Sequence, residues 1–167
     1  TTGINNTLIG GLAGDAITTG GYNVAVGATA LTANTTASFN TAVGYQAAYS
    51  NTTGADNTAM GTAAMYPNTT GNYNAAFGSA SLRQNTTGSF NTALGQSALN
   101  QNTTASNNTA VGYQAGYDNT TGSITAVGSY ALGDNTTGAS NVAVGGYDGT
   151  SFSALRLNTT GSYNTSM

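Results

Sequence analysis

Apolar and polar residues alternate in a five-residue block of the type Asn-Thr-Ala-Val-Gly, which recurs along the whole chain. A side-chain period of two indicates a β-strand, with Thr41 and Val43 on one face and Ala42 on the other. The third position is alanine in eight of the nine complete blocks, and the fourth is always large and apolar. We therefore expect the fourth positions to form the core ladder: Ile9, Val26, Val43, Met60, Phe77, Leu94, Val111, Val127 and Val144.

The glycine that closes each block recurs every 17 residues from Gly10 to Gly145, with one interval of 16. A second apolar stretch follows, such as Ala30-Leu31, and then an Asn-Thr-Thr motif that is typical of turns. Each unit is too short for a pair of packed helices and offers two short strands separated by turns. We therefore predict an all-β fold, a β-solenoid (parallel β-roll) of about nine 17-residue coils with two short strands per coil. Stacked asparagines would form amide ladders.

The repeat covers residues 1–167 as a single array. The pattern is cut within a repeat at both ends, so we expect the chain to be a piece of a longer array. The last complete unit carries six extra residues within about 146–157, which makes this irregular insertion a surface loop. Its residues Tyr147, Asp148 and Arg156 form a candidate recognition loop, although a neutral insertion explains it equally well.

Charged side chains are few: seven in 167 residues, with a net charge of −3 and no His or Cys. Transition-metal sites require His or Cys clusters, and nucleic-acid binding requires a basic face. No apolar run reaches the length of a membrane helix. We therefore expect no enzyme, cofactor, metal site, nucleic-acid partner or membrane insertion.

Each coil would bury few apolar side chains against the entropy of ordering 17 residues, so a second buried surface is expected. Small side chains let another chain approach closely, which makes the alanine column the candidate for packing in a homotrimer: Ala25, Ala42, Ala59, Ala76, Ala93, Ala110, Ala126 and Ala143. On this view Val43→Asp would unfold its coil. Ala42→Leu would leave the coil intact and block association.

Several other patterns have a functional and a structural interpretation. The Asn-Thr-Thr motifs are glycosylation sequons, although the same residues are good turn formers. The candidate glycosylation sites are Asn34, Asn51, Asn68, Asn85, Asn102, Asn119, Asn135 and Asn158. Aromatic residues before the block, such as Tyr22 and Phe39, could stack on sugar rings or pack against neighbouring chains.

The block at Asn40–Gly44, with Ala47 after it, resembles the head repeats of the YadA-type trimeric autotransporter adhesins, which form left-handed parallel β-rolls. The segment Gly44–Gly54 also resembles repeats of bacterial surface proteins and phage-type tail fibres. The resemblance covers nearly the whole chain, but the Asn-Thr-Thr turn lengthens each unit. It implies a trimeric fibre or adhesin shaft that is extracellular, at a cell surface or on a virion.

These observations lead to two hypotheses for function. The first is a structural and adhesive fibre segment whose partner is itself, as a homotrimer or filament, with a host-surface glycan or protein as a further partner. Its rigid array would supply multivalent attachment. The alternative is an ice-binding solenoid, in which the first threonines of the Asn-Thr-Thr motifs, such as Thr35 and Thr52, would repeat at the coil spacing.

Overall fold

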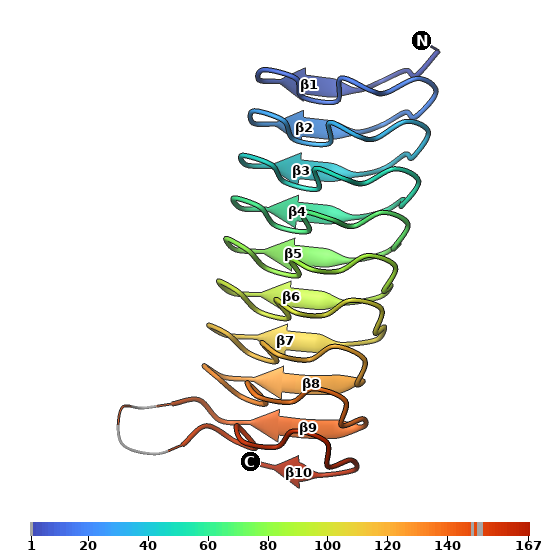
Figure 1. Cartoon of the computed structure of the whole chain (residues 1–167). Helices are drawn as coiled ribbons and strands as arrows, with labels where there is room; N and C mark the ends of the chain where they lie inside the picture. The colour runs from blue at the N-terminus through green and yellow to red at the C-terminus, as the bar shows by residue number, and fades with distance from the viewer. Residues whose placement is uncertain (1, 148, 150–151) are drawn as a thin grey trace.

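The computed structural model describes residues 2–147, 149 and 152–167. Within these residues the chain forms ten short parallel strands and no helix (Figure 1). The strands are β1 (Thr7–Ile9), β2 (Val24–Val26), β3 (Thr41–Val43), β4 (Thr58–Met60), β5 (Ala75–Phe77), β6 (Thr92–Leu94), β7 (Thr109–Val111), β8 (Ile124–Val127), β9 (Asn141–Val144) and β10 (Thr165–Ser166).

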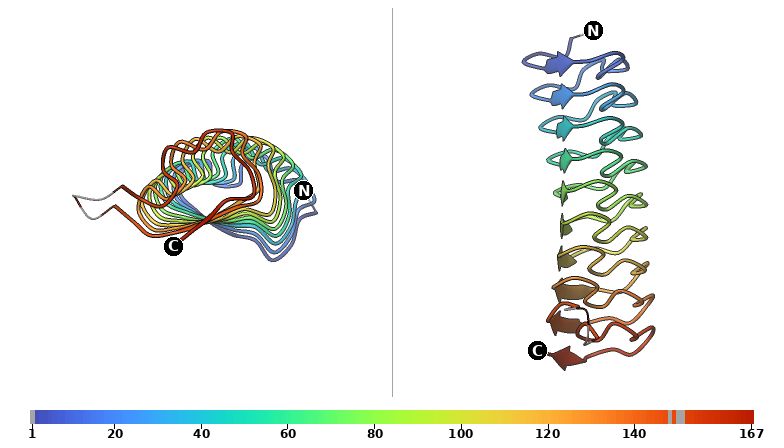
Figure 2. Two further views of the ribbon diagram at one scale, coloured as in Figure 1. Left: turned by 90° about the horizontal axis from the view of Figure 1, so that it is seen from below. Right: turned by 90° about the vertical axis from the view of Figure 1, so that its left-hand side faces the viewer.

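The strands make one sheet whose spatial order is the order of the sequence, β1 to β10. Equivalent residues of successive coils pair, so that Ala42 lies between Ala25 and Ala59. Seen along the stack, the coils lie over one another with a progressive rotation, and the two ends of the chain lie at opposite ends of the stack (Figures 1 and 2). The predicted β-solenoid of coils of about 17 residues is confirmed.

The second apolar stretch of each coil is not a strand, so the expectation of two strands per coil is wrong. Gln46 (φ 57°) and Ala48 (φ 49°) are both in the left-handed region, and this alternation recurs in the other coils. Such residues cannot continue an extended strand. The backbone still pairs between coils, because the N–H of Gln46 donates to the carbonyl of Ala28 (3.1 Å) and that of Ala48 to the carbonyl of Ala64 (2.9 Å).

The core is built from the alanines of the strands and from larger side chains of the second apolar stretch of each coil. We call this stretch, which includes Leu31 and Met65, the turning segment. Ala42 and Ala93 are fully buried, as are Leu31 and Met65, which come from that segment. The interior of so thin a coil has room for one large side chain, and the turning segment supplies it. The strand is therefore limited to alanine on its inward face.

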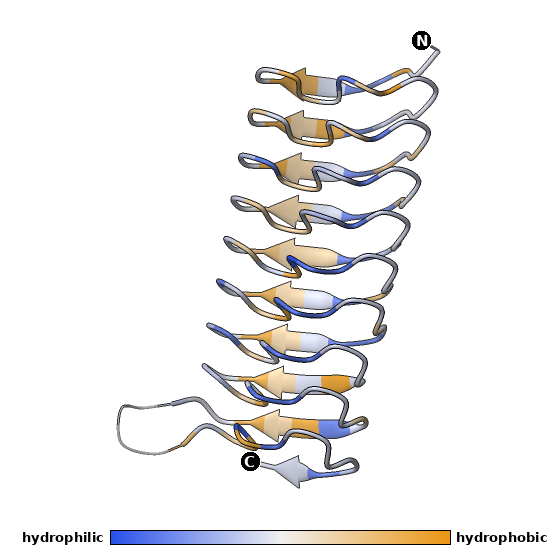
Figure 3. Ribbon diagram, in the orientation of Figure 1, coloured by the Kyte–Doolittle hydropathy of each residue, from blue (hydrophilic) through white to orange (hydrophobic). Residues whose placement is uncertain are grey.

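The predicted core ladder is consequently wrong, because the fourth positions of the block point outward. Their exposure ranges from half-buried for Val26, Val43, Val111 and Val127 to clearly exposed for the rest of the column: Ile9, Met60, Phe77, Leu94 and Val144. Figure 3 shows the apolar colour toward the ends of β1 to β9 and the polar colour at most of their starts, whereas β8 begins in the apolar colour. The physical reason is that alternation defines two faces without saying which is the inner one.

The alanine column is wrongly placed for the same reason. All eight alanines predicted to contact another chain are no more than 1% exposed inside their own coils: Ala25, Ala42, Ala59, Ala76, Ala93, Ala110, Ala126 and Ala143. Side chains buried within one chain cannot also touch a second. A contact between chains must therefore use the outward side of the sheet or another surface.

One coil shows how the interior tolerates irregular residues. Ile124 occupies the place that asparagine holds in the other strand starts, and Gly116 occupies the place of Leu99. A Cβ on Gly116 would lie 2.6 Å from Cδ1 of Ile124 and 3.1 Å from Cδ2 of Leu99, so these two side chains fill the space that glycine leaves. Volume is thus conserved across neighbouring coils, as close packing requires.

Candidate interaction surfaces

Two ladders of asparagine side chains run through the interior of the solenoid. Their hydrogen bonds hold one side of each coil inward, so the other residues face outward. In the first, Oδ1 of Asn40 accepts the backbone N–H of Asn57 (3.0 Å), while its Nδ2 donates to the carbonyl of Gly54 (2.9 Å). In the second, Nδ2 of Asn68 donates to Oδ1 of Asn51 (2.9 Å) and to the carbonyl of Gly71 (3.0 Å). The predicted amide ladders are therefore present, with buried groups that are fully hydrogen-bonded.

The second ladder uses the asparagines of the candidate glycosylation sequons. Seven of them are 0% exposed: Asn34, Asn51, Asn68, Asn85, Asn102, Asn119 and Asn135. Asn158 is half-buried, and its Nδ2 donates to Oδ1 of Asn135 (2.9 Å) and to the carbonyl of Gly161 (2.9 Å). A glycan on Nδ2 would have to displace these bonds and the next coil. The fold therefore contradicts glycosylation at these sites and explains the motif by turn formation.

The two threonines of each Asn-Thr-Thr motif have different surroundings. The hydroxyl of Thr52, the first, donates to the carbonyl of Thr69 in the next coil (2.9 Å), and this side chain is half-buried. Thr53, the second, is exposed, as is its equivalent in every coil: Thr19, Thr36, Thr70, Thr87, Thr104, Thr121, Thr137 and Thr160. The column expected to bind ice, Thr35 and Thr52 with their equivalents, therefore serves coil-to-coil bonding.

The outward side of the sheet is a continuous uncharged surface. We call it the outer sheet face and define it by the second and fourth positions of each block, such as Thr41 and Val43. From Thr7 to Val144 it holds only Thr, Val, Ala, Ile, Met, Phe and Leu. Leu94 is 47% exposed and Met60 40%. Sequence reasoning missed this face, although its variable residues, set against the nearly constant inward Asn and Ala columns, distinguish the two sides.

Aromatic side chains beside the sheet stack between coils. Tyr22 and Phe39 are parallel with ring centroids 5.2 Å apart, and Tyr73 and Phe90 are parallel at 5.1 Å. All four are more than half exposed. Asp56 and other polar residues interrupt the column, so it provides separate aromatic pairs.

The insertion leaves the coil after Gly145 and returns at Ala154, whose N–H donates to the carbonyl of Gly145 (3.1 Å). The described residues of this segment lead away from the stack beside β9 (Figure 1). Of the candidate recognition residues, Tyr147 is exposed, Arg156 is half-buried, and Asp148 lies outside the described residues. The guanidinium carbon of Arg156 lies 4.9 Å from the ring centroid of Tyr130.

Tyr130 connects the insertion to the regular coils. Its ring meets Tyr113 edge-on at 5.2 Å and Tyr147 at 6.2 Å. The neighbouring Tyr113 side chain is the main cause that raises the pKa of Tyr130. The tyrosines therefore hold the base of the insertion to the coils before it.

Two carboxylates occupy equivalent places in adjacent coils. The N–H of Asp118 donates to the carbonyl of Gly133 (2.9 Å), and that of Asp134 to the carbonyl of Arg156 (3.0 Å). Burial, and then repulsion from Asp134, raise the pKa of the Asp118 carboxyl above its ordinary value. Among the described residues there is no group of three or more His, Cys, Asp and Glu side chains that could hold a metal ion.

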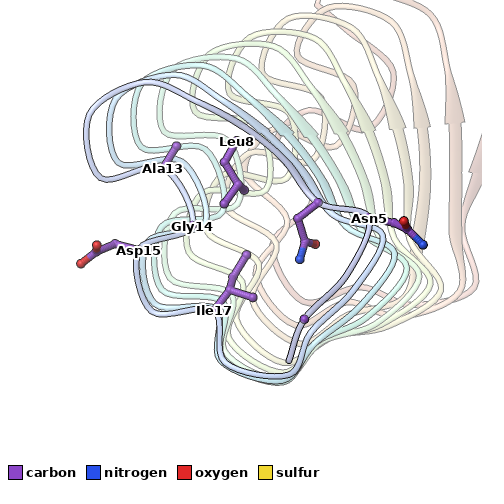
Figure 4. A pocket seen from close by; sticks show the side chains of 8 residues that line it. Asn5, Leu8, Ala13, Gly14, Asp15 and Ile17 are labelled. Atoms are coloured by element: carbon purple, nitrogen blue, oxygen red, sulfur yellow. The ribbon is translucent and has the colours of Figure 1, made fainter. Parts of the chain in front are cut away.

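A hollow of about 490 Å³ lies at the N-terminal end of the solenoid. Leu8 and Ile17 point into it, whereas Asp15 points away (Figure 4). Ala13 and Gly14 complete the apolar lining, and they are core positions of the first coil. Gly3, Asn5 and Asn6 also line it, and the hollow is the interior of that coil at the end of the stack.

In the described part of the chain, no helix is long and apolar enough to cross a membrane. No protein-family model matches the chain, and comparisons with curated proteins and with solved structures give no match either.

Proposed function

We propose that this chain is a non-catalytic segment of an extracellular fibre or adhesin shaft that associates with further copies of itself through the outer sheet face. The observation that carries the proposal is the outward-facing apolar column of that face, which is exposed or half-buried from Ile9 to Val144 and holds no charged residue. Exposed apolar surface of this extent is typical of interaction sites.

The outer sheet face is long and narrow. Ten strands at about 4.8 Å spacing make it about 43 Å long, and three strand residues span about 10 Å. The flat area of the face is therefore about 430 Å², roughly half of the 800 Å² per partner of a standard interface, and neighbouring surfaces such as the aromatic pairs must supply the rest. Because the face itself is uncharged, identical copies meet there without repulsion between charged side chains.

Three copies around an axis parallel to the stack turn this face of every chain toward the axis, as the resemblance to trimeric fibres implies, whereas two copies around such an axis would be the smaller closed assembly. The shared axis keeps the coils in parallel and makes a rigid shaft, and repeated weak contacts on the remaining surfaces supply multivalent attachment. The exposed described residues of the insertion, such as Tyr147, are the surface that we assign to contact with a host glycan or protein.

The test is the solution mass of the chain alongside that of Val43→Asp/Val111→Asp, which places two carboxylates on the outer sheet face. We expect a mass three times that of the 16.5 kDa chain for the parent and a folded monomer for the variant. A mass that is the same in both proteins would contradict the assignment of the interface. A large heterogeneous species would point to a filament instead of a trimer.

Ice binding is the second candidate, and one observation favours it. The exposed second threonines of the Asn-Thr-Thr motifs, such as Thr53 and Thr70, repeat along the stack at the coil spacing. Thermal hysteresis and ice recrystallisation separate the candidates: a monomer that is active in both assays supports ice binding, and an inactive trimer supports the fibre.

A further inference from the structure

One position in the aromatic column beside the sheet differs from all the others. The column consists of the residue before each five-residue block, and Asp56 is its only member with an aromatic residue in both adjacent coils, Phe39 and Tyr73. Phe39, Asp56 and Tyr73 share a left-handed backbone, with φ of 61°, 58° and 55°. Each N–H donates to a carbonyl of the preceding coil, at 3.1, 3.3 and 3.2 Å. The two rings and the shorter carboxylate therefore start from equivalent places in successive coils.

The rings of Phe39 and Tyr73 each turn one face toward the coil of Asp56. Phe39 stacks on Tyr22 with 5.2 Å between centroids and 6° between planes, and Tyr73 stacks on Phe90 at 5.1 Å and 10°. Parallel rings this close must overlap face to face, because coplanar rings side by side would clash. The other face of each ring is turned along the stack, away from its pair. These two faces, with the Asp56 carboxylate between them, define a slot.

The height of the slot is two coil steps. At about 4.8 Å per step, the centroids of Phe39 and Tyr73 are about 10 Å apart. A positive charge midway lies about 5 Å from each centroid, within the roughly 6 Å over which an aromatic face attracts a cation. Carbon atoms in contact with a ring lie about 3.5–4.0 Å from it. The methyl groups of a trimethylammonium ion therefore fill the remaining space, whereas a flat guanidinium group would leave gaps on both sides.

The charge in the slot is negative and open to solvent. Asp56 is exposed, and each of the two slot rings is 56% exposed. The guanidinium carbons of the two arginines lie against rings elsewhere, 6.0 Å from the centroid of Tyr66 and 4.9 Å from that of Tyr130. Neither arginine therefore places its charge in the slot. A cation that enters it gains the attraction of the carboxylate without displacing another cation.

We propose that the slot formed by Phe39, Asp56 and Tyr73 binds a quaternary ammonium group of the choline type. The two rings contact the methyl groups from opposite sides, and the carboxylate complements the positive charge. One chain supplies all three groups, so the inference is independent of self-association and adds a ligand class to the proposed fibre. Contacts between copies would use the rims of the aromatic pairs, whereas the slot uses the two faces between them.

A proton NMR titration of the parent chain with choline tests the proposal. Protons over the face of an aromatic ring shift upfield, so we expect the methyl signal to move upfield and to saturate with a Kd of about 1–10 mM. The neutral isostere of choline, in which carbon replaces nitrogen, has the shape without the charge. Ethanolamine has the charge without the methyl groups. We expect each of these controls to bind at least about fivefold more weakly.

Two variants separate the charge from the walls of the slot. Asp56→Asn keeps the space and removes the charge, and we expect binding to weaken about fivefold. Asp56→Tyr fills the slot, and we expect it to abolish the upfield shift. The column already accommodates aromatic residues in adjacent coils, so the fold is preserved.

The matched control is Asp56→Asn/Asn107→Asp, which keeps the net charge of the chain. It moves the carboxylate to a place in the same column with one aromatic neighbour, Phe90, in the preceding coil. We expect this variant to bind choline as weakly as Asp56→Asn. Binding restored to the parent affinity would overturn the proposal, because charge alone would then account for it.

The remaining outcomes are equally direct. A parent chain that leaves the choline signal unchanged overturns the slot, whatever its mass in solution, and leaves the proposed self-association intact. Equal binding of choline and its neutral isostere also overturns it, as does a folded Asp56→Tyr variant that keeps the upfield shift. Sedimentation of the parent with phosphatidylcholine vesicles, and not with phosphatidylglycerol vesicles, supports a lipid head group as the source. Binding of free choline without sedimentation supports a soluble ligand.

Discussion

Within one strand, the inward and the outward face differ in residue type and burial more than successive coils differ from each other. On β3, Ala42 is fully buried against the turning segment, while Val43 on the opposite face is half-buried and its column is exposed at other coils. The inward face is constrained by the width of the coil, which explains its nearly constant residues. The outward face has no such constraint within one chain. Small residues thus mark the core here, and large apolar residues mark the surface available for contacts.

We expect the largest loss of stability from the replacement of a buried asparagine on the inward side of the coil. Asn68→Asp removes the Nδ2 donor that bonds Asn51 and Gly71 and leaves a charge among acceptors. We expect a loss of about 3 kcal/mol or more in the free energy of unfolding, measured by denaturant titration. The control is Thr70→Asp, an exposed site two residues away, with an expected change within about 0.5 kcal/mol. Equal losses in both variants would contradict the structural role of the ladder.

Two substitutions on β3, Ala42→Leu and Val43→Asp, test the difference between the inward and the outward face. Leucine at the buried site overpacks the coil, and we expect a loss of about 1–3 kcal/mol in the free energy of unfolding. Aspartate at the outward site should cost about 1 kcal/mol or less and weaken association instead. Denaturant titration and solution mass provide the two readouts. The opposite pattern would restore the core ladder that alternation first suggested.

The glycine that closes each five-residue block lets the backbone at the end of the strand pack closely against the next coil. Gly61 has φ +139°, and a Cβ there would lie 2.5 Å from the carbonyl oxygen of Gly78. Gly61→Ala is therefore expected to cost about 1–2 kcal/mol in the free energy of unfolding. Thr62→Ala, at the exposed next residue, is the control and should be nearly neutral. A thermal melt that shifts equally in both variants would contradict the close approach of the backbones.

Much of this fold could be predicted from the sequence, but the side of the strand that faces inward could not. The 17-residue period and the stacking of equivalent residues, such as Asn51 on Asn68, follow from the repeat itself. The non-glycine residues in the left-handed region, Gln46 and Ala48 among them, are disfavoured locally and are stabilised by bonds to adjacent coils. Local patterns therefore predicted a strand where the stack imposes a series of turns.

The candidate site was only partly predictable for a related reason. Alternation assigned Thr41 and Val43 to a common face, and that grouping is retained in the structure. The width of the coil, which decides that this face is outside, depends on Leu31 and its equivalents in the turning segment. No local sequence pattern indicates how wide the coil is.

We expect the smallest change in stability from removal of the charge on Asp118. Because burial and Asp134 raise the pKa of Asp118, its ionisation is less favourable in the folded state than in the unfolded state. Stability therefore falls as pH rises from about 4 through the raised pKa. Asp118→Asn should raise stability at pH 7 by about 0.5 kcal/mol, after solvent screening, and leave it unchanged at pH 3. A gain of the same size at both pH values would contradict this origin.

The central claim is that the outward face of the sheet, not its alanine face, joins copies of the chain. Light scattering on a size-exclusion column tests it most directly, with the parent chain and Val43→Asp/Val111→Asp measured side by side. The account predicts three times the 16.5 kDa chain mass for the parent and a folded single-chain mass for the variant. A stable, folded monomer of the parent chain would contradict it.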